Sequence, residues 1–381
     1  MAIVLVCAVP VCASRPAAVA QSAIPGWLDR YEQGDYEAVL AEVRVAPDIK
    51  AFGKQLAELA PPWVAAKGPA SIDRRRLIAA TFALEAIRPA MERIVPTPGS
   101  PVAAPILEWA CQLLRSTPAP LPAERWWHLA AVALIERSFN EYLLTGYLGP
   151  GFDSKQYGPV GNHLAHSAAR FPDEPRFKLT IVVSREVHLT GGAWSWLGRP
   201  LTASNRSGDA ALMAKQSENW TAVVESRNAP AWKRLIADYN ALAVFEGIRA
   251  ESHLRAGVLE FRLGNHEGAL DHLRQVEPNT QEPALVYLSR FFRAKVFERL
   301  GRPADAEAEY RSALRAVPLA ESAATALAAS LFLRDARPES SELIDAMFTV
   351  RPTPADPWRD YWCGDCRLWS RYIERLRKEL K

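Results

Sequence analysis

The chain has 381 residues, 49% of them hydrophobic and 23% charged, as is typical of a folded globular protein. A formal net charge of +3 is nearly neutral for this length, so it gives no general attraction to nucleic acid. Outside an apolar N-terminal segment only Cys111, Cys363 and Cys366 remain, which excludes a disulfide scaffold. Alanine-rich segments, with valine and isoleucine scattered rather than alternating, favour helices over sheet.

The first twenty residues differ in character from the rest. Residues 2–13 are almost wholly apolar, and small residues follow that end in Ala18-Val19-Ala20. This pattern is typical of a secretory signal peptide, so we expect residues 1–20 to direct export to the periplasm or cell envelope. No basic residue precedes the apolar run, so either the start lies upstream or the segment has another purpose. The run is too short to span a bilayer, and we expect no transmembrane segment.

Residues 21–228 carry irregular helical patterns that proline and glycine clusters interrupt. The run from Gly34 to Leu40 predicts a turn followed by a helix. Further helices are predicted at 73–91, 105–115, 123–144 and 163–172. Pro61-Pro62 predicts a break between helices, and the stretch 191–208 predicts a long loop.

Three stretches within residues 229–352 share small residues at equal offsets. In each stretch a small residue lies seven positions before a turn residue, and another lies five positions after it. The turn residues are Gly264, Gly301 and Asp335, the preceding ones Gly257, Ala294 and Ala328, and the following ones Ala269, Ala306 and Ser340. Small residues allow two antiparallel helices to touch, and glycine permits the backbone dihedrals that end the first helix.

The turn residues are 37 and 34 residues apart, and the pattern resembles the 34-residue repeat of the tetratricopeptide family. The resemblance implies an all-α fold, a right-handed α-solenoid of helix–turn–helix repeats. About three copies would lie in 229–352, with divergent copies in 21–228. Such arrays bind a partner protein along a concave groove, so we expect a non-enzymatic interaction scaffold that needs no cofactor.

By this resemblance, the first helix of each repeat lines the groove. The residues that give the groove its character are Arg255, Phe261, Arg262, Phe291, Phe292, Lys295 and Arg299. Basic and aromatic side chains together suit an acidic–hydrophobic partner segment, although the phenylalanines serve equally well as packing residues. One subgroup of the family grips a C-terminal carboxylate with lysine and asparagine. Leu254 and Val258 stand at those places, which argues against that ligand.

Residues 353–381 combine a tryptophan-rich turn with a C-terminal helix. We expect Trp358, Trp362 and Trp369 to cover the apolar face of the last repeat, so that this helix caps the array. The pair Cys363-x-x-Cys366 leaves three alternatives open: structural thiols or a local disulfide, a redox pair, or half of a metal site. No histidine lies near the pair in sequence, so we favour the structural role and expect no metal.

A catalytic motif is absent from the sequence, including phosphate-binding glycine loops, His-Glu-x-x-His and Gly-x-Ser-x-Gly. His163 and His166 share a helix face, but no acidic residue or cysteine stands at helical spacing beside them, so we expect a solvated face. The alternative to a scaffold is an enzyme or sugar-binding protein whose site lies in 51–228, bordered by the tryptophan-rich loop.

Overall fold

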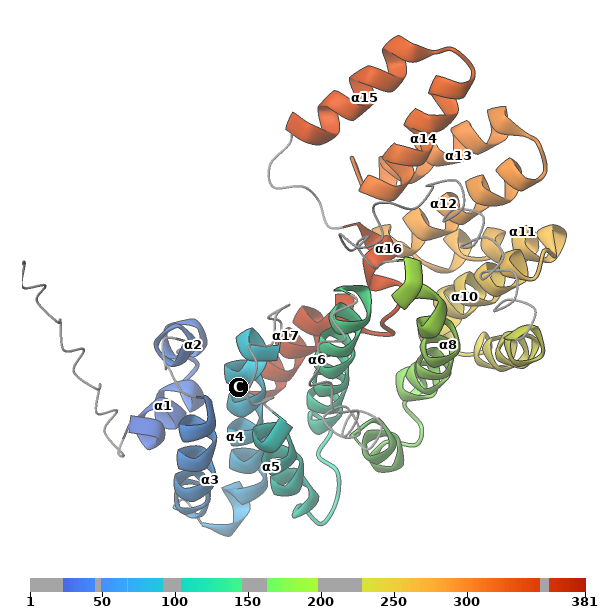
Figure 1. Cartoon of the computed structure of the whole chain (residues 1–381). Helices are drawn as coiled ribbons and strands as arrows, with labels where there is room; N and C mark the ends of the chain where they lie inside the picture. The colour runs from blue at the N-terminus through green and yellow to red at the C-terminus, as the bar shows by residue number, and fades with distance from the viewer. Residues whose placement is uncertain are drawn as a thin grey trace, which may run out of the picture.

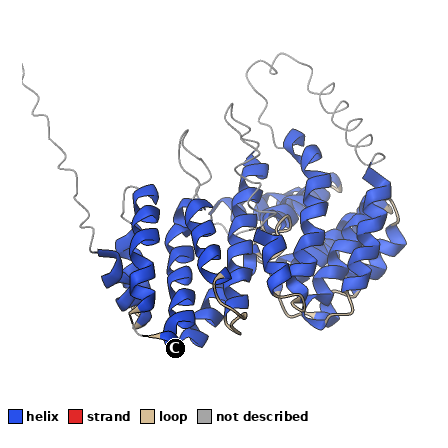
Figure 2. Ribbon diagram, turned by 90° about the horizontal axis from the view of Figure 1, so that it is seen from below, coloured by secondary structure: helices blue, strands red, loops and turns tan. Residues whose placement is uncertain are grey.

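The computed structural model describes residues 23–44, 49–66, 68–91, 104–145, 163–197, 228–349 and 356–381. Helices and turns make up these ranges, with no strand among them (Figures 1 and 2). The predicted all-α class is confirmed for them, whereas the right-handed solenoid stays a prediction. The predicted signal peptide lies outside the described residues. Within these ranges no helix has the length and apolar character needed to cross a membrane.

The first half of the chain is a series of helices that pack against their neighbours. They are α1 (Ala23–Glu32), α2 (Tyr36–Arg44), α3 (Ile49–Ala65), α4 (Pro69–Met91), α5 (Ala104–Arg115), α6 (Glu124–Thr145), a helix at 163–170 and α8 (Pro175–Leu197). The helices predicted here are confirmed to within a few residues. Two predicted interruptions are wrong. Pro61 and Pro62 lie inside α3, whose end is held by the buried Trp63 and Val64. The helix α8 continues through 191–197, and the rest of the predicted loop, 198–208, lies outside the described residues.

The second half begins with a helix at 228–242 and continues as three helix pairs. Its elements are η2 (Glu246–Ile248), α10 (Arg249–Arg262), α11 (His266–Arg274), η3 (Glu277–Asn279), α12 (Pro283–Arg299), α13 (Pro303–Ala316), α14 (Glu321–Leu333) and α15 (Arg337–Thr349). A Cβ on Gly257 would lie 2.8 Å from Cγ of Leu273, so only glycine permits this approach of α10 to α11. In the last pair, Ser340 donates to the carbonyl oxygen of Ala328 at 2.9 Å. The predicted small-residue contacts are confirmed for the first and last pairs, and Ala294 and Ala306 of the middle pair are both fully buried.

Four turns between paired helices share one backbone geometry. The residue at the centre of each turn has a positive φ: Gly34, Gly264, Gly301 and Asp335. The next residue in every turn donates its N–H to the carbonyl oxygen five positions earlier, at 2.9–3.1 Å. This bond is the Schellman ending of a helix, which requires a left-handed residue and so favours glycine. The turns predicted from the sequence are therefore confirmed, including the one at Gly34 in the divergent half.

Two clusters of buried side chains form the core, and the C-terminal segment contributes to both. Its elements are α16 (Pro357–Asp360), η4 (Cys366–Leu368) and α17 (Trp369–Leu380). The first cluster runs from Ile24 to Phe177 and includes the buried face of α17. The second runs from Leu179 to Leu331 and includes Tyr361 and Trp362. The turn between α16 and α17 therefore connects the two halves of the molecule.

The C-terminal helix does not cap the last helix pair, which corrects the prediction. Its buried stripe is Trp369, Tyr372, Ile373, Leu376 and Leu380, and it packs along α6. Figure 1 shows α17 beside α4 and α6, far from α15. Arg377 also pairs with Glu85 of α4 at 2.6 Å. The last pair consequently keeps three large apolar side chains at the surface, Phe332, Leu333 and Phe348.

Candidate functional site

The chain's own C-terminal segment covers part of the predicted groove. We call the side of α10, α12 and α14 that carries the predicted groove positions the first-helix surface. On this surface α16 packs against α12, and the Trp358 ring lies 5.1 Å from that of Phe292 and 6.3 Å from that of Phe291, between centroids. The Tyr361 ring follows at 6.1 Å from Phe292. These aromatic contacts exclude water from the middle of the first-helix surface.

The start of this segment is fixed at the N-terminus of α14. The buried Asp356 carboxylate accepts the backbone N–H of Ser322 at 2.5 Å and that of Trp358 at 2.9 Å. A carboxylate at this place satisfies backbone donors that the first turn of a helix leaves open. The segment therefore reaches from α14 across α12 to α10.

Three predicted groove residues are unavailable to a partner because they are buried. Arg255, Phe291 and Phe292 are each exposed by 7% or less, which corrects the prediction for them. The two phenylalanines pack against α16, so they are packing residues, which is the alternative role that the sequence left open for them. Arg255 donates to the carbonyl oxygen of Tyr361 at 2.8 Å and pairs with Glu186 of α8 at 3.4 Å. All three residues bind the segment of this chain.

Phe261 and Arg262 are partly buried, and Arg262 lies next to this segment. The guanidinium of Arg262 lies 5.3 Å from the Trp362 ring and 5.6 Å from the Trp232 ring. Both contacts have the distance of a cation–π interaction. The Phe261 ring lies 6.3 Å from that of Phe292. Arg262 therefore contributes to packing. A charge-reversing variant, Arg262→Glu, would disturb the fold as well as any contact with a partner.

Of the remaining predicted residues, Arg299 is exposed, and Lys295 is half-buried and pairs with Glu298 of the same helix at 3.0 Å. The next first helix continues this area with Thr325, Ala329 and the 57% exposed Phe332. Ala329 follows Lys295 by 34 residues, so the two occupy equivalent repeat positions. We call these residues the open section: Lys295, Arg299, Thr325, Ala329 and Phe332. It combines two basic side chains with one exposed aromatic ring.

A buried set of charges holds the C-terminal turn against α8 and α10. Glu251 is 1% exposed and pairs with Arg176 at 3.0 Å, Arg255 at 3.0 Å and Arg367 at 2.7 Å. Burial by itself raises the pKa of the Glu251 carboxyl, but the three arginines outweigh it and lower that pKa to about 2. Arg176 also pairs with Asp365 in the turn, at 3.1 Å. Three separate elements thus share one compensated charge network.

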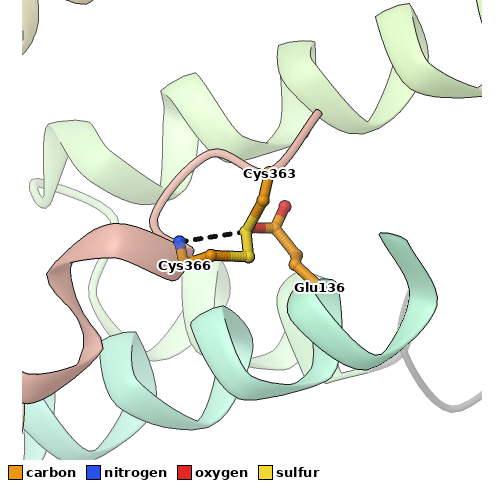
Figure 3. A group of neighbouring side chains, drawn as sticks. All are labelled: Glu136, Cys363 and Cys366. Atoms are coloured by element: carbon orange, nitrogen blue, oxygen red, sulfur yellow. Dashed lines mark hydrogen bonds between the residues drawn. A yellow bond between two sulfur atoms is a disulfide. The ribbon is translucent and has the colours of Figure 1, made fainter. Parts of the chain in front are cut away.

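Cys363 and Cys366 form a local disulfide in the turn between α16 and α17, with Cα atoms 5.6 Å apart (Figure 3). Both are buried, and the N–H of Cys366 lies 2.9 Å from Sγ of Cys363. Glu136 of α6 points at the pair: one carboxylate oxygen lies 3.3 Å from Sγ of Cys363 and accepts the N–H of Gly364 at 3.1 Å. Burial and the charge of Asp365 raise the pKa of Glu136 to about 8, against the opposing effect of Arg255.

Replacing Glu136 by glutamine is expected to stabilise the oxidised protein above about pH 5. The folded-state pKa of about 8 exceeds the ordinary value of 4.5, so the stability of the wild type falls as the pH rises between these values. Glutamine stays neutral and keeps the acceptor for Gly364. We expect a gain on the order of 2 kcal/mol at pH 8 and none at pH 4, measured by urea unfolding. An equal change at both pH values would contradict this.

The divergent half contains a row of three hydrogen-bonded side chains that the sequence did not predict. His128 lies 2.9 Å from Oγ of Ser167 through Nδ1 and 3.3 Å from Glu124 through Nε2. The same residue types carry nucleophilic catalysis in hydrolases. Here each side chain is at most 1% exposed, and burial lowers the pKa of His128. The row ties the helix at 163–170 to α6, and its buried hydroxyl gives no support to the alternative of a catalytic site in 51–228.

His163 is buried, so the predicted solvated face is wrong for this residue. Its Nδ1 lies 3.1 Å from Sγ of Cys111. His166 is partly buried, with its ring 5.6 Å from that of His128. Burial lowers the pKa of both His163 and His166 to about 4, which leaves them neutral at pH 7. His163 therefore packs between helices, whereas His166 keeps part of its ring at the surface.

No family model matches this chain, and no curated protein matches it significantly. Neither comparison names a substrate, cofactor or partner. The surface chemistry of the described residues is therefore what indicates a function.

Proposed function

We propose that the protein is a non-enzymatic scaffold that holds a segment of a partner protein on the first-helix surface. The seating of residues 356–362 on that surface carries the proposal. This segment reads Asp-Pro-Trp-Arg-Asp-Tyr-Trp, so it has the acidic and aromatic character that suits the basic and aromatic groove positions. It occupies α12 and α10 within the same chain. The open section beside it is not covered by this segment, and a partner segment of the same acidic and aromatic character would bind there.

The open section has the means to hold such a partner. Covering the 57% exposed ring of Phe332 with an apolar side chain would contribute roughly 1–2 kcal/mol. An acidic side chain near Lys295 or Arg299 would add about 0.5–1 kcal/mol, since exposed ion pairs are weak. Several contacts of this size, less the entropy of association, correspond to a dissociation constant of roughly micromolar order. Weak, exchangeable binding of a partner segment is the expected mode.

Two finer features belong to the same proposal. The helix pairs form a continuous right-handed array of the tetratricopeptide type, for which the shared Schellman turns are the support. The chain is exported, and its partner belongs to the cell envelope. The apolar run before Ala18-Val19-Ala20 supports export, and a Cys363–Cys366 disulfide suits an oxidising compartment.

Charge reversal in the open section tests the proposal. The double variant Lys295→Glu, Arg299→Glu should lower recovery of the partner from envelope fractions at least about tenfold, because attraction of an acidic segment becomes repulsion. The matched control is Arg274→Glu, Arg315→Glu, which reverses two exposed charges on the second helices α11 and α13. The control should bind as the wild type does. Equal recovery by the wild type and the Lys295, Arg299 variant would exclude the open section.

A further inference from the structure

Three groups that ligate metal ions converge where α6 meets the C-terminal turn. The two sulfur atoms and a carboxylate oxygen of Glu136 all lie within 4.8 Å of one another (Figure 3). A tetrahedral zinc ion holds sulfur at about 2.3 Å and oxygen at about 2.0–2.2 Å, which sets ligand separations of roughly 3.4–3.8 Å. Once the S–S bond is broken, small side-chain rotations bring the three groups to these separations.

The surroundings of this group are those that metal ligands need. The N–H of Cys366 points at Sγ of Cys363, and the N–H of Gly364 orients the Glu136 carboxylate. Such hydrogen bonds fix ligand geometry and stabilise negative charge on the ligand. The buried hydroxyl of Thr180 has no hydrogen-bond partner in the described part of the chain. This hydroxyl lies close to the Glu136 carboxylate. A Cβ added to Gly364 would be 3.0 Å from Oγ1 of Thr180 and 3.5 Å from Oε2 of Glu136.

We propose that Cys363, Cys366 and Glu136 bind one zinc ion when the disulfide is reduced, with Thr180 or a water molecule at the fourth position. Two thiolates with one carboxylate suit zinc better than magnesium or calcium, which prefer oxygen ligands alone. The disulfide links two residues of the same turn, whereas the metal would link that turn to α6. The reduced protein would therefore keep a cross-link between the C-terminal turn and the first half of the chain.

Reduction of the disulfide by a phosphine is a balanced two-electron reaction. The phosphine gives two electrons to the S–S bond and becomes a phosphine oxide, taking its oxygen atom from water. The same water molecule supplies the two protons of the thiols. Zinc binding then releases both thiol protons, and the carboxyl proton where Glu136 carries one.

Cobalt and zinc titration of the full-length chain tests the site. The chain is reduced with a phosphine, freed of it without air, and titrated with Co²⁺ and then Zn²⁺. We expect one Co²⁺ per chain with strong near-ultraviolet sulfur-to-cobalt absorption, and its displacement by Zn²⁺. Glu136→Gln should weaken zinc binding at least about tenfold, and Cys363→Ser or Cys366→Ser at least about a hundredfold. Cys111→Ser, which removes a buried thiol outside the group, should bind as the wild type does.

Several outcomes would overturn the proposal. One is a reduced chain that binds no Co²⁺, and another is absorption that survives Cys363→Ser. Zinc affinity unchanged by Glu136→Gln would remove Glu136 from the site and the link to α6 with it. Circular dichroism of the same samples shows whether the reduced chain keeps its helices. A disulfide that resists the phosphine in the folded chain, or a reduced chain that loses its helices and does not regain them with Zn²⁺, also contradicts the proposal.

Discussion

Replacing Glu251 by alanine is expected to destabilise the protein by about 3–5 kcal/mol, because buried arginine charges lose the carboxylate that they share. Arg176, Arg255 and Arg367 contact Glu251 and lie on α8, on α10 and in η4. The loss would loosen the C-terminal turn from both helices. The measurement is the urea unfolding midpoint at pH 7. Glu267→Ala, which removes an exposed glutamate from α11, is the control and should change stability by less than about 0.5 kcal/mol.

The pH dependence of the same variant gives a second readout. The folded-state pKa of Glu251 is about 2, below the ordinary value of 4.5. Its contribution to stability is therefore fully present above about pH 4.5 and is lost as the pH falls towards 2. The wild type should lose more stability than Glu251→Ala across this interval. Parallel pH profiles, or a destabilisation below about 1 kcal/mol at pH 7, would contradict the role given to this network.

Replacing Trp362 by alanine is expected to cost about 3–5 kcal/mol, the range for a large aromatic side chain lost from a core. Trp362 is 6% exposed and packs against Trp358, Tyr361 and Arg262. Hydrogen exchange should show faster opening in α10 and α12, because the segment that covers them is loosened. Phe348→Ala, at a 72% exposed aromatic residue of α15, should leave stability nearly unchanged. A loss of stability in Trp362→Ala as small as that in Phe348→Ala would mean that the segment does not stabilise the first-helix surface.

The helix pairs could be predicted because their determinants are local. Gly257 and Ala269 are small because α10 and α11 touch there, and Gly264 takes a φ of +77° that other residues adopt at a cost. Such requirements recur at equal offsets in each pair, so they are visible in one sequence. Asp335 shows the limit of the rule, since it takes the same conformation without being glycine.

The path of the C-terminal segment could not be predicted, because it depends on contacts between residues far apart in the chain. An amphipathic helix such as α17 shows which of its faces is buried but not which helix covers it. Phe291 and Phe292 were ambiguous for the same reason: aromatic residues at groove positions suit a partner segment and an internal one equally. Arg255 looked like a groove cation because its counter-ions Glu186 and Glu251 are recognised only in the folded chain.

The cysteine pair was visible in the sequence, but Glu136 was not, since it lies 227 residues before Cys363. One signal could have drawn attention to it. Glu136 directly follows the apolar run Leu129–Ile135, so a carboxylate continues a buried helix face. An acidic residue in that position needs a partner, which the turn at Gly364 supplies. The sequence alone does not indicate where that partner lies.

Where the partner lies on the chain tests the proposed scaffold function most directly. A photo-crosslinking amino acid is placed at position 329 in the open section or, as the control, at the exposed position 342 on α15. The proposal predicts one specific cross-linked partner from position 329 and none from position 342. The Lys295→Glu, Arg299→Glu background should abolish the product. Equal cross-linking from both positions, or none from position 329 while the partner is still captured, would show that the partner binds elsewhere.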